Sequence, residues 1–185
     1  MKNVPSLPPN YTLQSSYDLK SPQLNWIIQL IFLVIAGIMV GAAFLFAWIP
    51  ASSLHGLVVA AITIGLVLVY MSLHELTHGV VLSLLSKTPF RYAFRFPFLT
   101  TGSTSYYNKK SFILVCLVPS VLWGIVLGVL FTVVPSDYRL SLYIVLGLNV
   151  AGSAGDYLQV FLAFKTRPKG LIQDDGSITR IYQAS

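Results

Sequence analysis

Charged side chains are scarce in this sequence. Only 10% of its 185 residues are charged, and the whole chain holds six acidic residues and three histidines. An average soluble domain has about 25% charged residues, whereas this chain is 55% hydrophobic and has a mean hydropathy of +0.74. That composition excludes a soluble domain of ordinary type and predicts an integral membrane protein, with the lipid bilayer as its first partner.

Cysteine is nearly absent as well. The single Cys116 lies in an apolar run, so no intramolecular disulfide can form, and the residue is expected to pack as a small hydrophobic side chain. The net charge of +6 would suit nucleic acid, but the basic residues fall between and beyond the apolar runs, where a membrane protein carries them. We therefore expect no nucleic-acid partner.

Four apolar runs are long enough to cross a bilayer. They predict membrane helices over residues 24–49, 54–86, 111–134 and 138–164. Lys and Arg concentrate in residues 87–110 and beyond the runs at both ends, whereas the two outer connections hold only Arg139. The positive-inside rule then places both termini and the central loop in the cytoplasm.

The predicted fold class is an all-α polytopic membrane protein. A four-helix membrane domain occupies residues 24–165, between an irregular, proline-rich tail at 1–23 and a C-terminal tail at 166–185. In the central loop, aromatic residues alternate with other residues from Phe90 to Phe98, which favours a strand, and a turn at 100–103 can reverse the chain. This loop is either a small β-hairpin at the membrane surface or an aromatic and basic anchor.

Three ionisable residues stand together inside the second run, where such groups are costly in hydrocarbon and indicate function. They are His74, Glu75 and His78, in the pattern His-Glu-Leu-Thr-His. On a helix, two imidazoles four residues apart share one face and can bind one Zn²⁺, while the glutamate beside them takes a proton from the attacking water. The pattern predicts metal-assisted hydrolysis. The alternative is a polar cluster that links helices through hydrogen bonds.

Asp156 is the expected third ligand. The other acidic residues, apart from the glutamate of the motif, lie in the tails or in the outer connection. His78 is nine residues before Lys87 and Asp156 is nine residues before Lys165, so both lie about 13 Å from the cytoplasmic boundary. Pro119 lies at the same depth in the third predicted helix, where it should leave one backbone carbonyl free.

Asn149 is the last polar candidate within the predicted spans. It lies seven residues before Asp156, which is two helical turns along the same face. Its amide can either orient a substrate carbonyl or form a hydrogen bond between helices.

These residues also carry a family resemblance. The sequence is similar to small bacterial membrane proteins grouped as "putative zincin peptidases", a family of unknown function, and more distantly to the intramembrane site-two proteases. The first resemblance rests on the motif with its following Gly79, the basic aromatic loop, the proline in the third helix, Gly155-Asp156, and Asp175-Gly176 with Ile181-Tyr182 in the tail. It implies a Zn²⁺ peptidase of the bacterial cell membrane, with His74, His78 and Asp156 as ligands and Glu75 as base.

The sequence departs from the site-two proteases around its aspartate. Tyr157 follows Asp156, where those proteases usually have glycine, and no proline stands between Asn149 and Asp156. Ligation by Asp156 is therefore better supported than a substrate role for Asn149.

Two functions remain open. The leading hypothesis is an intramembrane zinc metallopeptidase that cuts a membrane-embedded or membrane-proximal segment of a protein or peptide near the cytoplasmic face. The alternative is a non-catalytic membrane protein whose polar cluster binds metal structurally, carries ions or ties helices together. Glu75 separates them, because only hydrolysis needs an acid beside the ligands.

Overall fold

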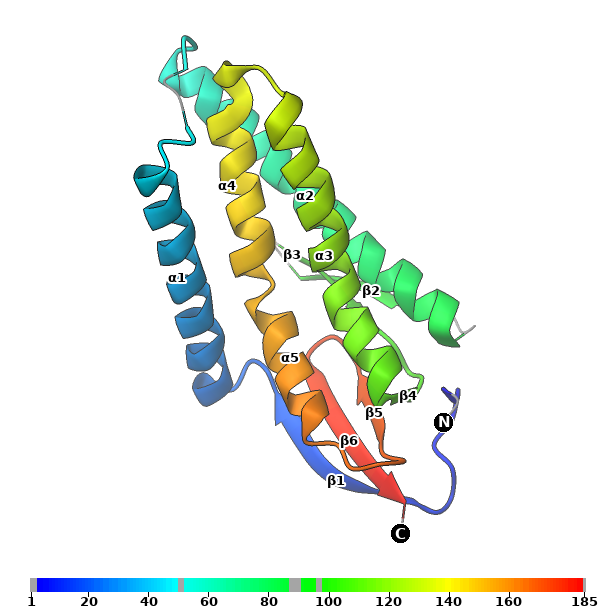
Figure 1. Cartoon of the computed structure of the whole chain (residues 1–185). Helices are drawn as coiled ribbons and strands as arrows, with labels where there is room; N and C mark the ends of the chain where they lie inside the picture. The colour runs from blue at the N-terminus through cyan, green and yellow to red at the C-terminus, as the bar shows by residue number, and fades with distance from the viewer. Residues whose placement is uncertain (1–2, 50–51, 87–90, 96–97, 185) are drawn as a thin grey trace.

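The computed structural model describes residues 3–49, 52–86, 91–95 and 98–184 and is mostly helical (Figure 1). Its helices are α1 (Pro22–Leu45), α2 (Gly56–Ser86), α3 (Lys109–Val133), α4 (Ser136–Gly152) and α5 (Ala154–Phe164). Its strands are β1 (Tyr11–Asp18), β2 (Arg91–Arg95), β3 (Phe98–Gly102), β4 (Tyr107–Asn108), β5 (Leu171–Asp174) and β6 (Ile178–Ala184). Both ends of the chain lie at the end of the molecule where the larger sheet sits (Figure 1).

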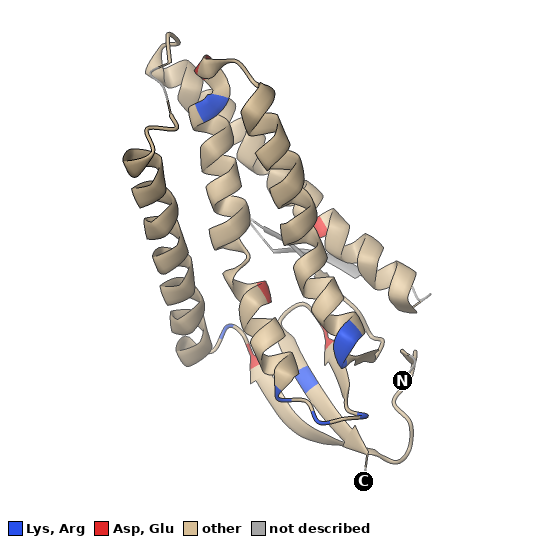
Figure 2. Ribbon diagram, in the orientation of Figure 1, with Lys and Arg blue, Asp and Glu red and all other residues tan. Residues whose placement is uncertain are grey.

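Three helices, α1, α2 and α3, are long and apolar enough to cross a membrane. Their outward surfaces are rich in Leu, Ile, Val and Phe, and α1 buries no residue completely against the rest of the chain. Figure 2 shows charged residues gathered around the sheet, with few along the helices. This distribution is what a bilayer around the helices requires, since charge is costly in hydrocarbon.

The predicted fourth span, 138–164, is not one helix. It is divided at Ser153 into α4 and α5, neither of which is long enough by itself to count as a spanning helix. The break lies in a run of Gly152, Ser153 and Gly155, which are poor residues for a helix interior, and the Ser153 hydroxyl donates to the Asn149 carbonyl (2.8 Å). Four membrane-spanning helices therefore stay a prediction.

The N-terminal tail was expected to be irregular, and this was wrong. Tyr11–Asp18 forms β1, an edge strand of an antiparallel sheet in the order β1-β6-β5-β4. Its partner β6 lies 160 to 173 residues away in the chain, with Tyr11 opposite Ala184 and Asp18 opposite Ile178. The strand is mostly polar and its partner is distant, so local sequence gave no sign of it.

The C-terminal tail is the other half of this sheet. β5 and β6 form a hairpin around the Asp-Asp-Gly turn, in which Gly176 has a φ of +87°, a conformation that favours glycine. The fold is therefore helical with a small sheet, rather than all-α.

The central loop does form a hairpin, but with a different register from the one predicted. β2 pairs with β3, with Ala93 opposite Thr100, so residues 98–102 are the return strand rather than the turn. Thr100 and Thr101 are β-branched and suit a strand. Residues beyond Gly102 lead instead into β4, which pairs with β5. Phe90, Phe96 and Pro97 lie outside the described residues.

Two apolar clusters hold the helices together. One lies between α2, α3, α5 and the larger sheet and includes Leu82, Phe112, Cys116, Ala163, Ile172 and Ile181. The other lies between α2, α3 and α4 and includes Tyr70, Leu127, Leu142 and Val145. The polar residues of the sequence motif lie on the stretch of α2 between them.

Candidate metal centre

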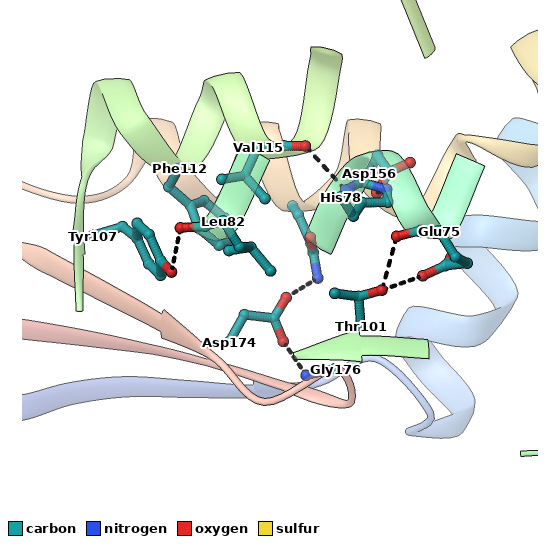
Figure 3. A pocket seen from close by; sticks show the side chains of 11 residues that line it. Glu75, His78, Leu82, Thr101, Tyr107, Phe112, Val115, Asp156, Asp174 and Gly176 are labelled. Carbon is teal, nitrogen blue, oxygen red and sulfur yellow. Dashed lines mark hydrogen bonds and ion pairs between the residues drawn. The ribbon is translucent and has the colours of Figure 1, made fainter. Parts of the chain in front are cut away.

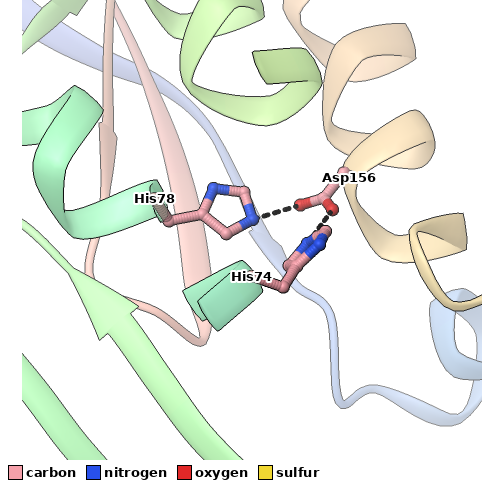
Figure 4. Close-up of side chains that lie close together, drawn as sticks. All are labelled: His74, His78 and Asp156. Atoms are coloured by element: carbon pink, nitrogen blue, oxygen red, sulfur yellow. Dashed lines mark ion pairs between the residues drawn. The ribbon is translucent and has the colours of Figure 1, made fainter. Parts of the chain in front are cut away.

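The three predicted ligands come together between α2 and α5 (Figure 4). His74 and His78 project from one face of α2, one turn apart, toward the carboxylate of Asp156 in the first turn of α5. The Nε2 atom of His74 is 3.5 Å from Asp156 Oδ2, and that of His78 is 3.4 Å from Asp156 Oδ1. One ligand atom from each residue lies within 4.8 Å of the other two.

A free carbonyl in α3 fixes the orientation of His78. The ring Nδ1 lies 3.0 Å from the Val115 carbonyl oxygen, which can only accept, so Nδ1 carries the hydrogen and Nε2 keeps its lone pair. In a regular helix this carbonyl would accept the N–H of residue 119. Residue 119 is proline, which has no N–H. The predicted effect of Pro119 is thus present, with His78 as the new partner of the freed carbonyl.

A hydrogen-bond chain fixes His74 in the same way. Asn149 donates from Nδ2 to the Ser120 carbonyl (2.9 Å), which turns its Oδ1 toward Tyr70. The Tyr70 hydroxyl donates to that oxygen (2.9 Å), so it accepts from His74 Nδ1 (3.0 Å). Asn149 is only 1% exposed and lies behind His74. Asn149 thus forms hydrogen bonds between helices and is connected to His74 through Tyr70, while a role in orienting a substrate stays a prediction.

Glu75 lies next to this cluster and is held by the small hairpin. The Thr101 hydroxyl, at the end of β3, lies 3.0 Å from both the Glu75 backbone carbonyl and its Oε2. The next residue, Gly102, packs directly on the backbone of Asp175, where a Cβ would collide. The carboxylate is thus positioned by a hydrogen bond from a strand that follows α2 in the chain.

The donor set fits a zinc ion. Two ligands bound at about 2.0–2.1 Å in a tetrahedral arrangement lie about 3.3 Å apart. The separations of 3.4 and 3.5 Å between the histidine nitrogens and the carboxylate oxygens are close to this value. Both Nε2 lone pairs point inward because both Nδ1 atoms are occupied by other partners, which is how metal-ligating histidines are usually held.

A family model described as "Putative zincin peptidase" matches residues 66–172, more than half of the chain. The chain belongs to this family. No curated protein and no solved structure matches this chain.

The match to the zincin peptidase family begins in α2 and ends in β5, so it includes His74, Glu75, His78 and Asp156. It also includes Pro119, Tyr70 and Asn149, which orient the two histidines in this structure. β1 and β6 lie outside it.

A pocket of about 130 Å³ opens beside Glu75 and His78 in this zincin-family chain (Figure 3). Apolar side chains of α2, α3 and β4 form one wall, namely Leu82, Tyr107, Phe112 and Val115. Asp174 faces them from the end of β5, where it accepts hydrogen bonds from the Gly176 N–H (2.8 Å) and the Gln159 amide. Burial raises the pKa of Asp174 to about 6, and the neighbouring Asp175 adds to the increase.

Sequence reasoning missed Tyr70, Thr101 and Asp174 as site residues. Tyr70 lies four residues before His74, so the helical period could have placed it on the same face. The other two come from β3 and β5, and only the folded chain brings those strands to α2.

Proposed function

We propose that the protein is a zinc metallopeptidase that hydrolyses a peptide bond in a membrane-embedded or membrane-proximal substrate. The observation that carries the proposal is the spacing of the His74 and His78 nitrogens from the Asp156 carboxylate, with Glu75 beside them. Zinc bound there would polarise the scissile carbonyl and lower the pKa of the attacking water to about 7.

The residues of this chain would perform the remaining steps. Glu75 takes the proton of the attacking water, and Thr101 holds its carboxylate toward the pocket. Glu75 can then pass this proton to the leaving amine. The pocket wall of Leu82, Phe112 and Val115 excludes water from one side and offers an apolar surface for a substrate side chain.

The place of the site in the fold suggests the kind of substrate. The ligands lie on α2 and α5, nearer the sheet than the opposite helix ends (Figures 1 and 4). The basic residues gather at the sheet end, which we propose is cytoplasmic. A substrate would then enter as an extended peptide alongside β3, whose Thr101 lies next to Glu75.

A non-catalytic role has one observation in its favour. Asp156 lies within ion-pair distance of both histidines, so the cluster can join α2 to α5 without hydrolysing anything. Glu75 is the discriminating residue, because a structural site has no use for a base. In a peptidase, Glu75→Gln retains zinc and the fold but lowers the rate of cleavage by a factor on the order of 10² or more, because the general base is lost.

The first experiment measures zinc in detergent-purified protein without chelators. Wild type and Glu75→Gln should each bind one equivalent, whereas His74→Ala and Asp156→Ala should bind little. His55→Ala is the matched control, because His55 lies outside α2 and its Nδ1 accepts the Leu57 N–H. Wild type without zinc would refute the metal site.

The second experiment looks for hydrolysis. Membrane vesicles containing wild type or Glu75→Gln are incubated, and new peptide termini are mapped by mass spectrometry. Termini that appear only with wild type support the peptidase. Zinc-loaded wild type that produces no new termini in vesicles from several sources favours the structural role.

A further inference from the structure

A second pocket, of about 240 Å³, lies away from the metal centre at the start of α3. It is formed where the first residues of α3 meet the turn between α5 and β5. Its lining residues are Asn108, Lys109, Lys110, Arg167, Pro168, Lys169 and Gly170. Neither the proposed peptidase activity nor the family description assigns it a role.

Four of the lining residues are basic and none is acidic. Among the described residues, no carboxylate lies within ion-pair distance of Lys109, Lys110, Arg167 or Lys169. Lys109 is partly engaged, because its Nζ donates to the Phe164 carbonyl (3.2 Å). Like charges gathered without a counter-charge repel one another, and a bound anion would remove that repulsion.

The turn that carries two of these cations is held in place by the sheet. The Tyr11 hydroxyl of β1 donates to the Lys169 carbonyl (2.8 Å), and the Gln183 amide of β6 donates to the Pro168 carbonyl (3.2 Å). Gly170 packs against Thr166 so closely that a Cβ would collide. The turn is therefore preorganised, which lowers the entropy cost of binding.

The helix beneath the pocket adds to its positive potential. α3 begins at Lys109, so the positive end of its dipole lies at the pocket, where Asn108 Oδ1 already accepts the Ser111 N–H (3.0 Å). Helix N-termini bind phosphate and similar anions for this reason. The lysines at the first two positions extend the same attraction to their side chains.

The surroundings favour a lipid over a small soluble anion. The pocket lies at the sheet end of α3, a helix that is apolar enough to span a membrane. Phe161 and Phe164 of the neighbouring α5 are 59% and 64% exposed, and exposed apolar side chains of this kind suit contact with a membrane. We propose that this pocket binds the phosphate of an anionic lipid headgroup, with Lys110 and Arg167 as its principal cations.

The test compares two charge-matched double variants in neutral detergent. Lys110→Gln with Arg167→Gln removes two pocket cations. Lys20→Gln with Lys165→Gln removes two cations outside the pocket lining. Thermal unfolding is measured during titration with dioctanoyl phosphatidylglycerol, with dioctanoyl phosphatidylcholine as the uncharged comparison and inorganic phosphate as the soluble one.

Phosphatidylglycerol should raise the Tm of wild type, and phosphatidylcholine should not. The pocket variant should bind phosphatidylglycerol about thirtyfold more weakly, which corresponds to about 2 kcal/mol for the two cations together. The control variant should stay within about twofold of wild type. Lys110→Arg with Arg167→Lys should keep the affinity, because both charges remain.

Three results would overturn the proposal. If the two double variants lose the same affinity for phosphatidylglycerol, the lipid is attracted to the basic protein surface in general and not to this pocket. An equal response to inorganic phosphate would assign the pocket to a free anion. If phosphatidylglycerol does not raise the Tm of wild type, the pocket does not bind this lipid, and its cations only help to orient the protein in the membrane. None of these outcomes depends on zinc or on peptidase activity.

Discussion

Replacing Pro119 by alanine should weaken zinc binding while stabilising α3. Pro119 is buried in the middle of a helix, where proline costs about 3 kcal/mol relative to alanine. Alanine restores an N–H at this position, and that N–H competes with His78 for the Val115 carbonyl (now 3.0 Å from Nδ1).

The size of the effect follows from what the carbonyl does for His78. Loss of a residue that orients a metal-bound histidine costs about 10–100-fold in metal affinity. A carbonyl oxygen can accept two hydrogen bonds, so His78 keeps part of its contact. We expect the zinc Kd of Pro119→Ala to rise about tenfold, which is about 1.4 kcal/mol, while the Tm of the metal-free protein rises.

Zinc affinity is measured by competition with a chromophoric chelator, and Tm is measured on the metal-free protein. Pro22→Ala is the control, because Pro22 is at the first position of α1 and distant from the site in the chain. It should leave the zinc Kd unchanged. An unchanged Kd in Pro119→Ala, with wild type binding zinc, would show that the freed carbonyl has no part in the site. If Pro119→Ala lowers both the Tm of the metal-free protein and the zinc affinity, the substitution has destabilised the fold as a whole.

Two further predictions concern the residues around the site. Tyr70→Phe removes the hydroxyl that links His74 to Asn149, so zinc should bind about tenfold more weakly, with the fold unchanged by circular dichroism; equal Kd values would separate Tyr70 from the site. Burial raises the pKa of Asp174 to about 6, whereas an aspartate in the unfolded chain has a pKa of about 3.9. The protonated Asp174 therefore stabilises the folded state fully below about pH 4, and this contribution is lost as the pH rises through 6. Asp174→Asn should therefore show a smaller decrease in metal-free Tm between pH 4 and 7 than wild type, and an identical pH profile would contradict the raised pKa.

The features of this protein that depend only on residues close together in the chain could be predicted from the sequence. Membrane-spanning length is a property of an uninterrupted apolar run, which is why α1, α2 and α3 were found close to their actual bounds. The spacing of His74 and His78 is set by the helical period, so their shared face was certain once α2 was a helix. Pro119 also acts locally, because a missing N–H frees the carbonyl four residues before it in any helix.

Contacts between distant segments could not be predicted in this way. A mostly polar β1 is a strand only because β6 lies beside it, and the hydrogen bonds of that pairing come from residues 160 to 173 positions away. The same is true of the Thr101 hydroxyl on Glu75 and of Asp174 facing the pocket. Asn149 shows the limit most clearly: its depth was predictable, but its amide direction was decided by Ser120 and Tyr70 on two other helices. Helical periods and apolar runs are encoded locally, whereas the partner of a polar group is chosen by packing.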